Sequence, residues 1–162
     1  MVHFNGRGAK EIIRHFCLAS FVLVSACSHE DEKTKTTTEA TYDSLWNNVF
    51  ADRCGTCHGV TTKSETLGGP DMRTKDAFYA NLVNKKGNDY PDWYTFQSIR
   101  SDCLSYSFIA PGLPAKSLIV AVFDPASAPC TVKSHTESPQ SIPLSSEDLA
   151  SLKTWITNGA SK

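Results

Sequence analysis

The feature that most constrains this chain of 162 residues is the run Cys54-Gly55-Thr56-Cys57-His58. It places two thiols and an imidazole, all strong metal or redox ligands, within one turn of chain. A zinc site would need a second ligand pair, and Cys103, Cys130 and His135 each stand alone. A thioredoxin-like dithiol should follow a strand and begin a helix, whereas a helical pattern precedes Cys54. A thiol–disulfide oxidoreductase remains an alternative.

The same run has the spacing of a c-type haem attachment site. The thiols of Cys54 and Cys57 can add to the two vinyl groups of one porphyrin, and His58 can then present a ring nitrogen to the iron. A pair of cysteines at this spacing is weak support for haem attachment by itself, because zinc sites and redox dithiols use it too. The adjacent histidine favours haem attachment over these two kinds of site. We therefore predict one covalent haem c, with His58 as the proximal iron ligand.

The N-terminal residues 1–26 have the pattern of a secretory signal peptide. Basic residues precede an apolar run over 16–26 that is too short to span a membrane stably. The following Cys27 completes a sequence that resembles the bacterial lipobox, in which the chain is cut before a cysteine that receives lipid. An ordinary cleaved signal with an incidental cysteine is the alternative. Ser28 favours, by analogy, a lipoprotein of the outer membrane.

Export of the chain helps to assign roles to its six cysteines. An exported chain reaches an oxidising compartment, where disulfides can form. One cysteine leaves with the signal, one takes lipid and two take haem. Cys103 and Cys130 remain, and we predict a disulfide between them, with two free buried thiols as the alternative. Closing this loop would stabilise the fold by about 3 to 4 kcal/mol from loop entropy alone.

We expect three segments: the signal over 1–26, a flexible tether over 27–41 and one domain over 42–162. The tether is polar, rich in threonine and without apolar periodicity. Cleavage would leave 13 basic and 16 acidic residues, and this slight acidity argues against nucleic acid as a partner. The remaining length suffices for one small domain.

Apolar spacing predicts two helices in the first half of the domain. The first is capped by Thr41 or Asp43 and leads into the haem-attachment run. The second begins after Thr74 and ends near Gly87. Each carries apolar residues at helical spacing, so each should bury one face.

Two more helices are predicted in the second half. A turn over 111–114 precedes a short helix around Leu118. The last helix is capped by Ser145 or Ser146 and ends at Gly159. Because strand patterns are scarce, we predict an all-α domain with long loops.

The domain resembles a small class I c-type cytochrome of the bacterial lipoprotein kind. The run Gly69-Pro70-Asp71-Met72 matches the family's G-P-x-L loop, and residues 111–119 resemble a P-G-x-P-x-x-S-L segment that has a cysteine before it and another after. The resemblance implies a cytochrome c-like domain whose long loops wrap one covalent haem. It also implies that the Pro70 carbonyl accepts a hydrogen bond from the His58 ring and orients it.

In this family the first and last helices of the domain cross through an aromatic contact. Here the resemblance implies Val49 or Phe50 against Trp155. A cluster of aromatic residues lies where family members wrap the haem edge, and we interpret it as core, with hydrogen bonds to a propionate as the alternative; its members are Tyr90, Trp93, Tyr94 and Phe96.

The chain departs from the family at the sixth iron ligand. Typical members supply a methionine from the loop before the last helix, and this loop has none. Met72, the only methionine beyond the initiator, falls in the G-P-x-L match as a packing residue. His135 is the one side chain of the loop that binds iron well, so we predict ligation by His58 and His135. An open sixth position and Met72 are the alternatives.

These inferences predict one-electron transfer by a membrane-tethered periplasmic cytochrome that meets redox partner proteins. The chain contains no nucleophile or paired-carboxylate constellation that indicates a bond-making enzyme. An open sixth position would instead suit a haem-based peroxidase or a gas-binding sensor.

Overall fold

The computed structural model describes residues 38–59, 69–93, 101–136 and 142–162. The chain divides into two compact units, Met1–Thr34 and Lys35–Lys162, and every described residue belongs to the second. The predicted signal, Cys27 and most of the predicted tether therefore lie outside the described residues. Within the described ranges, no helix has the length and apolar character needed to cross a bilayer.

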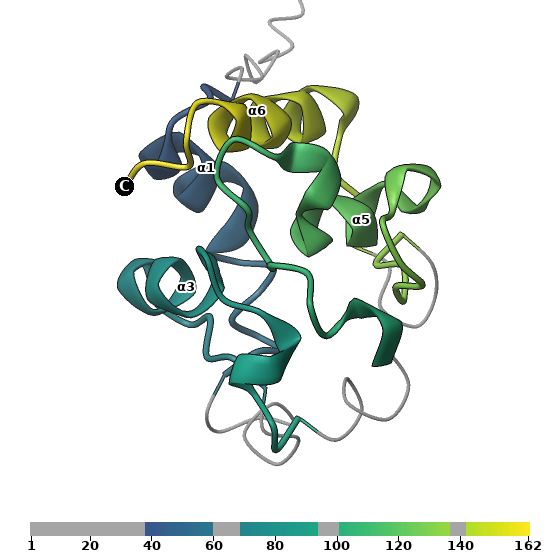
Figure 1. Ribbon diagram of the computed structural model, residues 1–162. Coiled ribbons are helices and arrows are strands. Elements are labelled where there is room, and N and C mark those ends of the chain that lie inside the picture. The colour runs from purple at the N-terminus through teal and green to yellow at the C-terminus, as the bar shows by residue number, and fades with distance from the viewer. Residues whose placement is uncertain (1–37, 60–68, 94–100, 137–141) are drawn as a thin grey trace, which may run out of the picture. The chain divides into compact units, whose positions relative to one another are not determined.

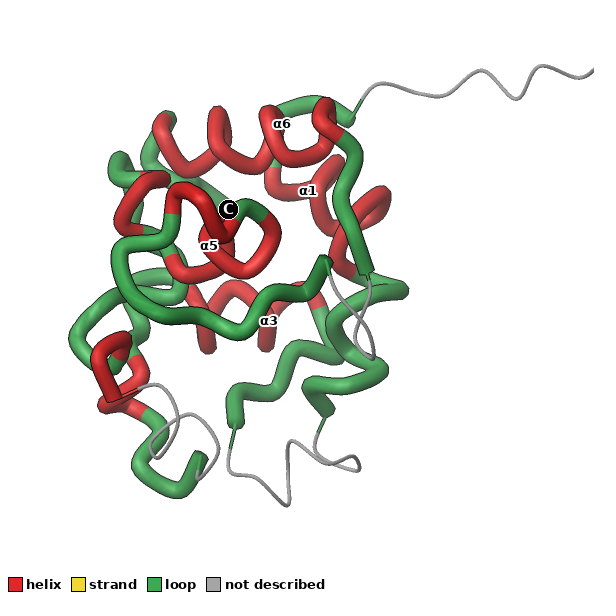
Figure 2. The backbone as a smooth tube through the Cα atoms, turned by 90° about the vertical axis from the view of Figure 1, so that its right-hand side faces the viewer, coloured by secondary structure: helices red, strands yellow, loops and turns green. Residues whose placement is uncertain are grey.

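The regular structure in these ranges is helical and contains no strand, which confirms the all-α prediction (Figure 1 and Figure 2). The α-helices are α1 (Tyr42–Leu45), α3 (Lys75–Leu82), α5 (Leu118–Phe123) and α6 (Ser146–Thr157). Shorter helical turns are the π-helical η1 (Trp46–Phe50) and the 3₁₀ turns η2 (Gly87–Asp89), η3 (Ser101–Cys103), η4 (Pro114–Lys116) and η5 (Pro125–Ser127).

Three of these helices begin at the residues that the sequence indicated. The hydroxyls of Thr41, Thr74 and Ser145 each accept a hydrogen bond, 3.0 to 3.2 Å long, from the backbone N–H three residues later. Such a cap satisfies one of the N–H groups that have no partner inside the helix. Local side-chain chemistry therefore determines where α1, α3 and α6 start.

The helix that leads to residues 54–58 is not uniform. After α1 it widens into η1, where the Ala51 N–H donates to the Trp46 carbonyl, five residues back, over 2.9 Å. Helical bonding then resumes, with the Cys54 N–H donating to the Phe50 carbonyl. A single π-helical turn of this kind holds one more residue than an α-helical turn.

The prediction that α3 ends near Gly87 was wrong, because the helix ends at Leu82. Val83 is extended, and Asn84 takes the left-handed conformation at φ 59°. The backbone there pairs with Ile109: the Ile109 N–H donates to the Leu82 carbonyl, and the Asn84 N–H donates to the Ile109 carbonyl. A contact between distant parts of the chain thus ends the helix before its local signals would.

Helix α6 packs against both α1 and α5 (Figure 2). Residues of all three helices contribute side chains to the hydrophobic core. The aromatic contact between α1 and α6 is made by Tyr42, whose ring stacks on Trp155 with centroids 5.4 Å apart. We had assigned this contact to Val49 or Phe50. Phe50 instead stacks on Phe78 of α3 at 4.4 Å.

Thr38 belongs to the folded domain, although we had placed it in the tether. Only 5% of its surface is exposed. Its hydroxyl donates to the Asp148 carboxylate over 2.7 Å, and its carbonyl accepts a hydrogen bond from Ser151. Both partners lie on α6, so the folded part of the chain begins before residue 42.

The predicted disulfide between Cys103 and Cys130 is present, with the two Cα atoms 5.4 Å apart. Cys103 has no exposed surface, so the bridge starts from the core at η3 and holds the loop that follows η5. The alternative of two free buried thiols is therefore excluded in this structure.

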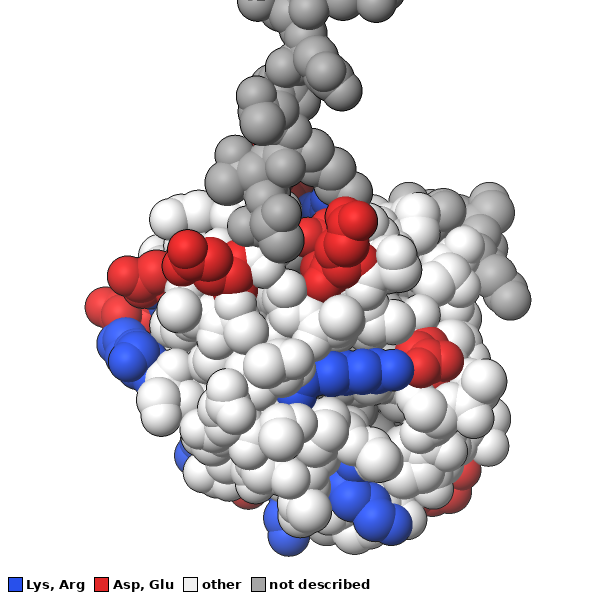
Figure 3. Space-filling model, turned by 90° about the horizontal axis from the view of Figure 1, so that it is seen from above, with Lys and Arg blue, Asp and Glu red and all other residues white. Residues whose placement is uncertain are grey.

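Figure 3 shows one face of the molecule, on which small groups of acidic and basic side chains, some of them side by side, lie on a largely uncharged surface. The chain carries a formal net charge of −1. An extended basic patch, which nucleic-acid binding would favour, is not seen on this face.

Candidate functional site

Residues 54–58 form a tight helical turn. The N–H groups of Cys57 and His58 both donate to the Cys54 carbonyl, over 3.2 and 2.9 Å. Cys54 is buried in the core whereas Cys57 is exposed, and neither is in a disulfide. Burial raises the pKa of the Cys54 thiol to about 12, so this thiol is protonated at neutral pH.

The loop that contains Pro70 lies directly against this turn. The Met72 N–H donates to the His58 carbonyl over 2.6 Å. The backbones approach so closely that a Cβ atom on Gly55 would lie 2.9 Å from the Cα atom of Arg73. Only glycine fits at position 55 without a shift of this loop. The structure thus brings together two segments that the sequence resemblance had paired.

His58 is partly buried, and its Nδ1 atom is fully buried without a hydrogen-bond partner among the described residues. The hydrogen bond predicted from this ring to the Pro70 carbonyl is therefore not made in this structure. Trp93 lies with its ring edge-on to the imidazole, with centroids 6.0 Å apart. Burial, and to a lesser extent the nearby His135, lower the pKa of His58 to about 4.

His135 lies beside His58. The two imidazole centroids are 6.4 Å apart, and the ring planes differ by only 16°. The backbone of His135 is held on both sides, because its N–H donates to the Val122 carbonyl and its carbonyl accepts from the Ile142 N–H, each over 2.8 Å. Burial lowers the pKa of His135; the hydrogen bond to the Lys133 carbonyl opposes this shift, and the Lys133 ammonium adds to it.

The separation of the two imidazole centres matches that of two rings that bind one metal. An imidazole nitrogen binds such a metal at about 2.0 to 2.1 Å, and the ring centre lies roughly 1.1 to 1.2 Å behind it, so two axial rings would have centroids a little over 6 Å apart. The observed separation is 6.4 Å. Both rings are neutral at neutral pH, which is the form that binds iron.

The other sequence candidates lie in the core. Met72 is 8% exposed and belongs to the buried cluster, as expected for a packing residue. Tyr90 and Trp93 pack against the same cluster, and the Tyr90 hydroxyl donates to the Asn81 carbonyl over 2.7 Å. This agrees with their interpretation as core. Tyr94 and Phe96 lie outside the described residues.

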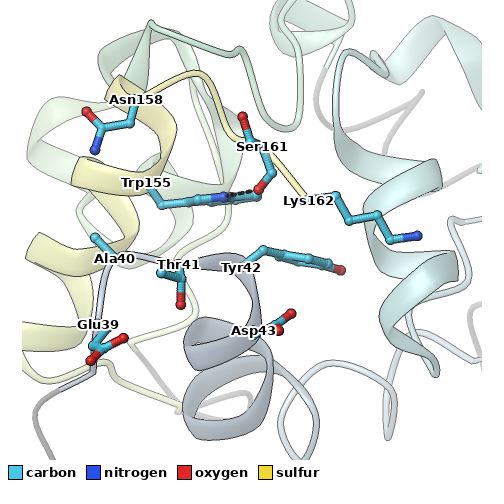
Figure 4. A pocket seen from close by; sticks show the side chains of 9 residues that line it. All are labelled: Glu39, Ala40, Thr41, Tyr42, Asp43, Trp155, Asn158, Ser161 and Lys162. Carbon is cyan, nitrogen blue, oxygen red and sulfur yellow. Dashed lines mark hydrogen bonds between the residues drawn. The ribbon is translucent and has the colours of Figure 1, made fainter.

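The described ranges contain no group of three or more histidine, cysteine, aspartate or glutamate side chains placed to hold a metal ion. Figure 4 shows a pocket between the start of α1 and the C-terminal residues, where Tyr42, Trp155 and Lys162 contribute to the lining. None of its lining residues belongs to the haem-attachment run or to the loop of His135.

Sequence reasoning missed two contacts of this site. The sequence did not predict that Trp93 lies beside His58. Nor did it predict that the Asp102 carboxylate accepts a hydrogen bond from the Thr131 N–H, over 2.7 Å. The position of Asp102 directly before a cysteine expected to form a disulfide was the one signal available. No comparable signal pointed to Trp93.

Three comparisons with known proteins were made, and no protein-family model, curated protein or solved structure matches this chain.

Proposed function

We propose that this protein is a monohaem c-type cytochrome that transfers single electrons. Cys54 and Cys57 would hold the haem covalently, and His58 and His135 would be the two axial ligands of its iron. The observation that carries the proposal is the pair of near-parallel imidazoles 6.4 Å apart, one of which belongs to the haem-attachment run. An open sixth position is disfavoured because His135 already stands beside His58.

The haem, when bound, supplies an iron atom that cycles between the ferric and ferrous states. Burial lowers the pKa of His58 and of His135, so each imidazole is neutral and has one nitrogen without a proton. The Trp93 ring, edge-on to the His58 imidazole, would limit the access of water to that side of the ring. Two imidazoles without a thioether ligand favour a low midpoint potential.

The arrangement of the helices supports a cytochrome c-like fold within the coarser all-α class. Helix α1 and the turn η1 lead into the haem-attachment run, and α6 crosses α1 through the stack of Tyr42 on Trp155. The loop of Pro70 contacts His58 through the Met72 backbone. The resemblance implies the same pairs of segments but other contacts. Tyr42 stands in the place expected for Val49 or Phe50, and the His58 ring makes no bond to the Pro70 carbonyl.

We further propose a periplasmic location, with a lipid anchor at Cys27 that favours the outer membrane, and redox proteins as partners. The support is the signal pattern over 1–26 and the lipobox resemblance. The disulfide between Cys103 and Cys130 agrees with an oxidising compartment.

A thiol–disulfide oxidoreductase is less well supported. An attacking thiol of that class needs a lowered pKa and exposure to its substrate. Cys54 is 9% exposed, and burial raises its pKa to about 12. The two thiols are therefore better placed for attachment of a cofactor than for exchange with a disulfide.

The proposal is tested by expressing the full chain together with the haem-attachment machinery. We expect one haem per chain in a pyridine haemochrome spectrum, and we expect it to stay with the polypeptide on a denaturing gel. The double substitution Cys54→Ala/Cys57→Ala should abolish covalent haem. Thr56→Ala, an exposed change between the two cysteines, should keep it. A wild-type chain without covalent haem would contradict the proposal and favour dithiol chemistry.

A further inference from the structure

We propose that Asp102 and the disulfide between Cys103 and Cys130 are positioning residues for His135. They would hold the loop from Cys130 onward in the one arrangement that keeps the imidazole at the iron. This inference rests on the proposed function, because it concerns the second axial ligand of that haem.

The loop is attached at two consecutive residues. The disulfide joins Cys130 to Cys103, and the Thr131 N–H donates to the Asp102 carboxylate over 2.7 Å. Both attachment points lie in η3, whose Cys103 has no exposed surface. A single attachment would leave the loop able to pivot, whereas two adjacent ones fix both its position and its direction.

The same loop orients the ring of His135. The Lys133 carbonyl lies 3.3 Å from Nδ1 of His135, so this nitrogen can donate to it. A ligating histidine commonly donates its second ring N–H to a carbonyl, which leaves the other nitrogen for the metal. The position of the Lys133 carbonyl depends on the attachment of Thr131, two residues earlier. The contacts of η3 therefore reach the imidazole through a short stretch of backbone.

His135 lies outside any helix, and the contacts of η3 add to the two backbone hydrogen bonds that His135 makes with Val122 and Ile142. Residues 131–136 have no regular secondary structure. A ligand on an irregular loop loses conformational freedom whenever it binds the iron, and this loss favours detachment. A loop that is already held in place has lost that freedom in advance, so His135 stays bound to the iron.

The experiment measures how open the sixth position is in the haem-loaded full chain. Asp102→Ala and Cys103→Ala/Cys130→Ala should each increase the fraction of high-spin ferric haem and speed carbon monoxide binding to the ferrous form by about tenfold or more, as expected when a group that orients a metal ligand is lost. Asp102→Asn keeps an oxygen acceptor for the Thr131 N–H and should stay near wild type. The cysteine double variant can fail to fold. Asp102→Ala, which leaves the disulfide in place, therefore tests by itself whether the contacts of η3 position His135.

A matched control removes a similar hydrogen bond elsewhere. The Asp89 carboxylate accepts from the Lys86 N–H over 2.7 Å in the loop of η2. Asp89→Ala should leave the spin state and carbon monoxide binding unchanged. A general loosening of the domain would affect this variant as well.

Combination with His135→Ala separates positioning from general loosening. Once His135 is absent, adding Asp102→Ala should change carbon monoxide binding no further, because the two substitutions act through one ligand. Additive effects of the two substitutions on carbon monoxide binding would overturn the proposal. The proposal would also fail if His135→Ala opened the sixth position while Asp102→Ala kept the spin state and carbon monoxide binding of the wild type. In that second case the proposed function stands. A low-spin spectrum unchanged by His135→Ala would contradict the proposed ligation itself, and with it this inference.

Discussion

Replacement of His135 by alanine is expected to change the ferric haem from low-spin to predominantly high-spin. The ferrous form should then bind carbon monoxide readily, because no protein ligand competes for the sixth position. In this structure the two imidazole centroids are 6.4 Å apart, close enough for both rings to bind one iron. Optical absorption and electron paramagnetic resonance of the purified full chain measure the change.

Two further variants make this result specific. His135→Met should restore a low-spin haem with a midpoint potential raised on the order of 100 mV, since a thioether ligand raises the potential and axial ligands tune it over ~0.8 V. Lys133→Ala keeps the backbone carbonyl near the His135 ring and removes only an exposed side chain, so its spectrum should match wild type. A His135→Ala protein with an unchanged low-spin spectrum would show that another group is the sixth ligand.

Truncation of Phe78 to alanine should lower the free energy of unfolding by about 3 to 5 kcal/mol, the usual cost of removing a buried aromatic ring. Phe78 has no exposed surface, and its ring contacts those of Tyr42, Trp46 and Phe50. It therefore joins α3 to α1 and η1 at the centre of the core. Guanidinium unfolding with the disulfide intact measures the loss as a shift of the midpoint at constant slope.

The control for this prediction is a truncation of an exposed apolar side chain. Leu113 is 57% exposed, so Leu113→Ala should change stability by less than about 0.5 kcal/mol. A loss below about 1 kcal/mol for Phe78→Ala would mean that the ring cluster is not the core that the structure describes.

The parts of the fold that could be predicted from sequence are those determined by neighbouring residues. Thr41, Thr74 and Ser145 cap their helices because a hydroxyl reaches N–H groups three residues away. The end of α3 could not be predicted in this way, since it depends on pairing with Ile109, 27 residues beyond Leu82. Thr38 is similar, because its partner Asp148 lies 110 residues further along the chain.

The same division applies to the candidate site. The attachment run is local, and its spacing alone indicates its chemistry. His135 could be proposed only because the loop offered no other good iron ligand, and its distance from His58 required the folded chain. The hydrogen bond from Thr131 to Asp102 and the contact of Trp93 with His58 join segments distant in sequence, so periodicity could not reveal them.

The π-helical turn η1 sets the rotational phase of the haem-attachment run. An α-helix advances about 100° per residue, and a π-helical turn accommodates one extra residue, so everything after Phe50 is displaced by about one residue relative to an uninterrupted helix. In the observed phase Cys54 faces the core and Cys57 faces outward. Deleting one residue from Trp46–Phe50 would therefore rotate Cys54 by about 100° and move its thiol away from the core, without altering Cys54, Cys57 or His58 themselves.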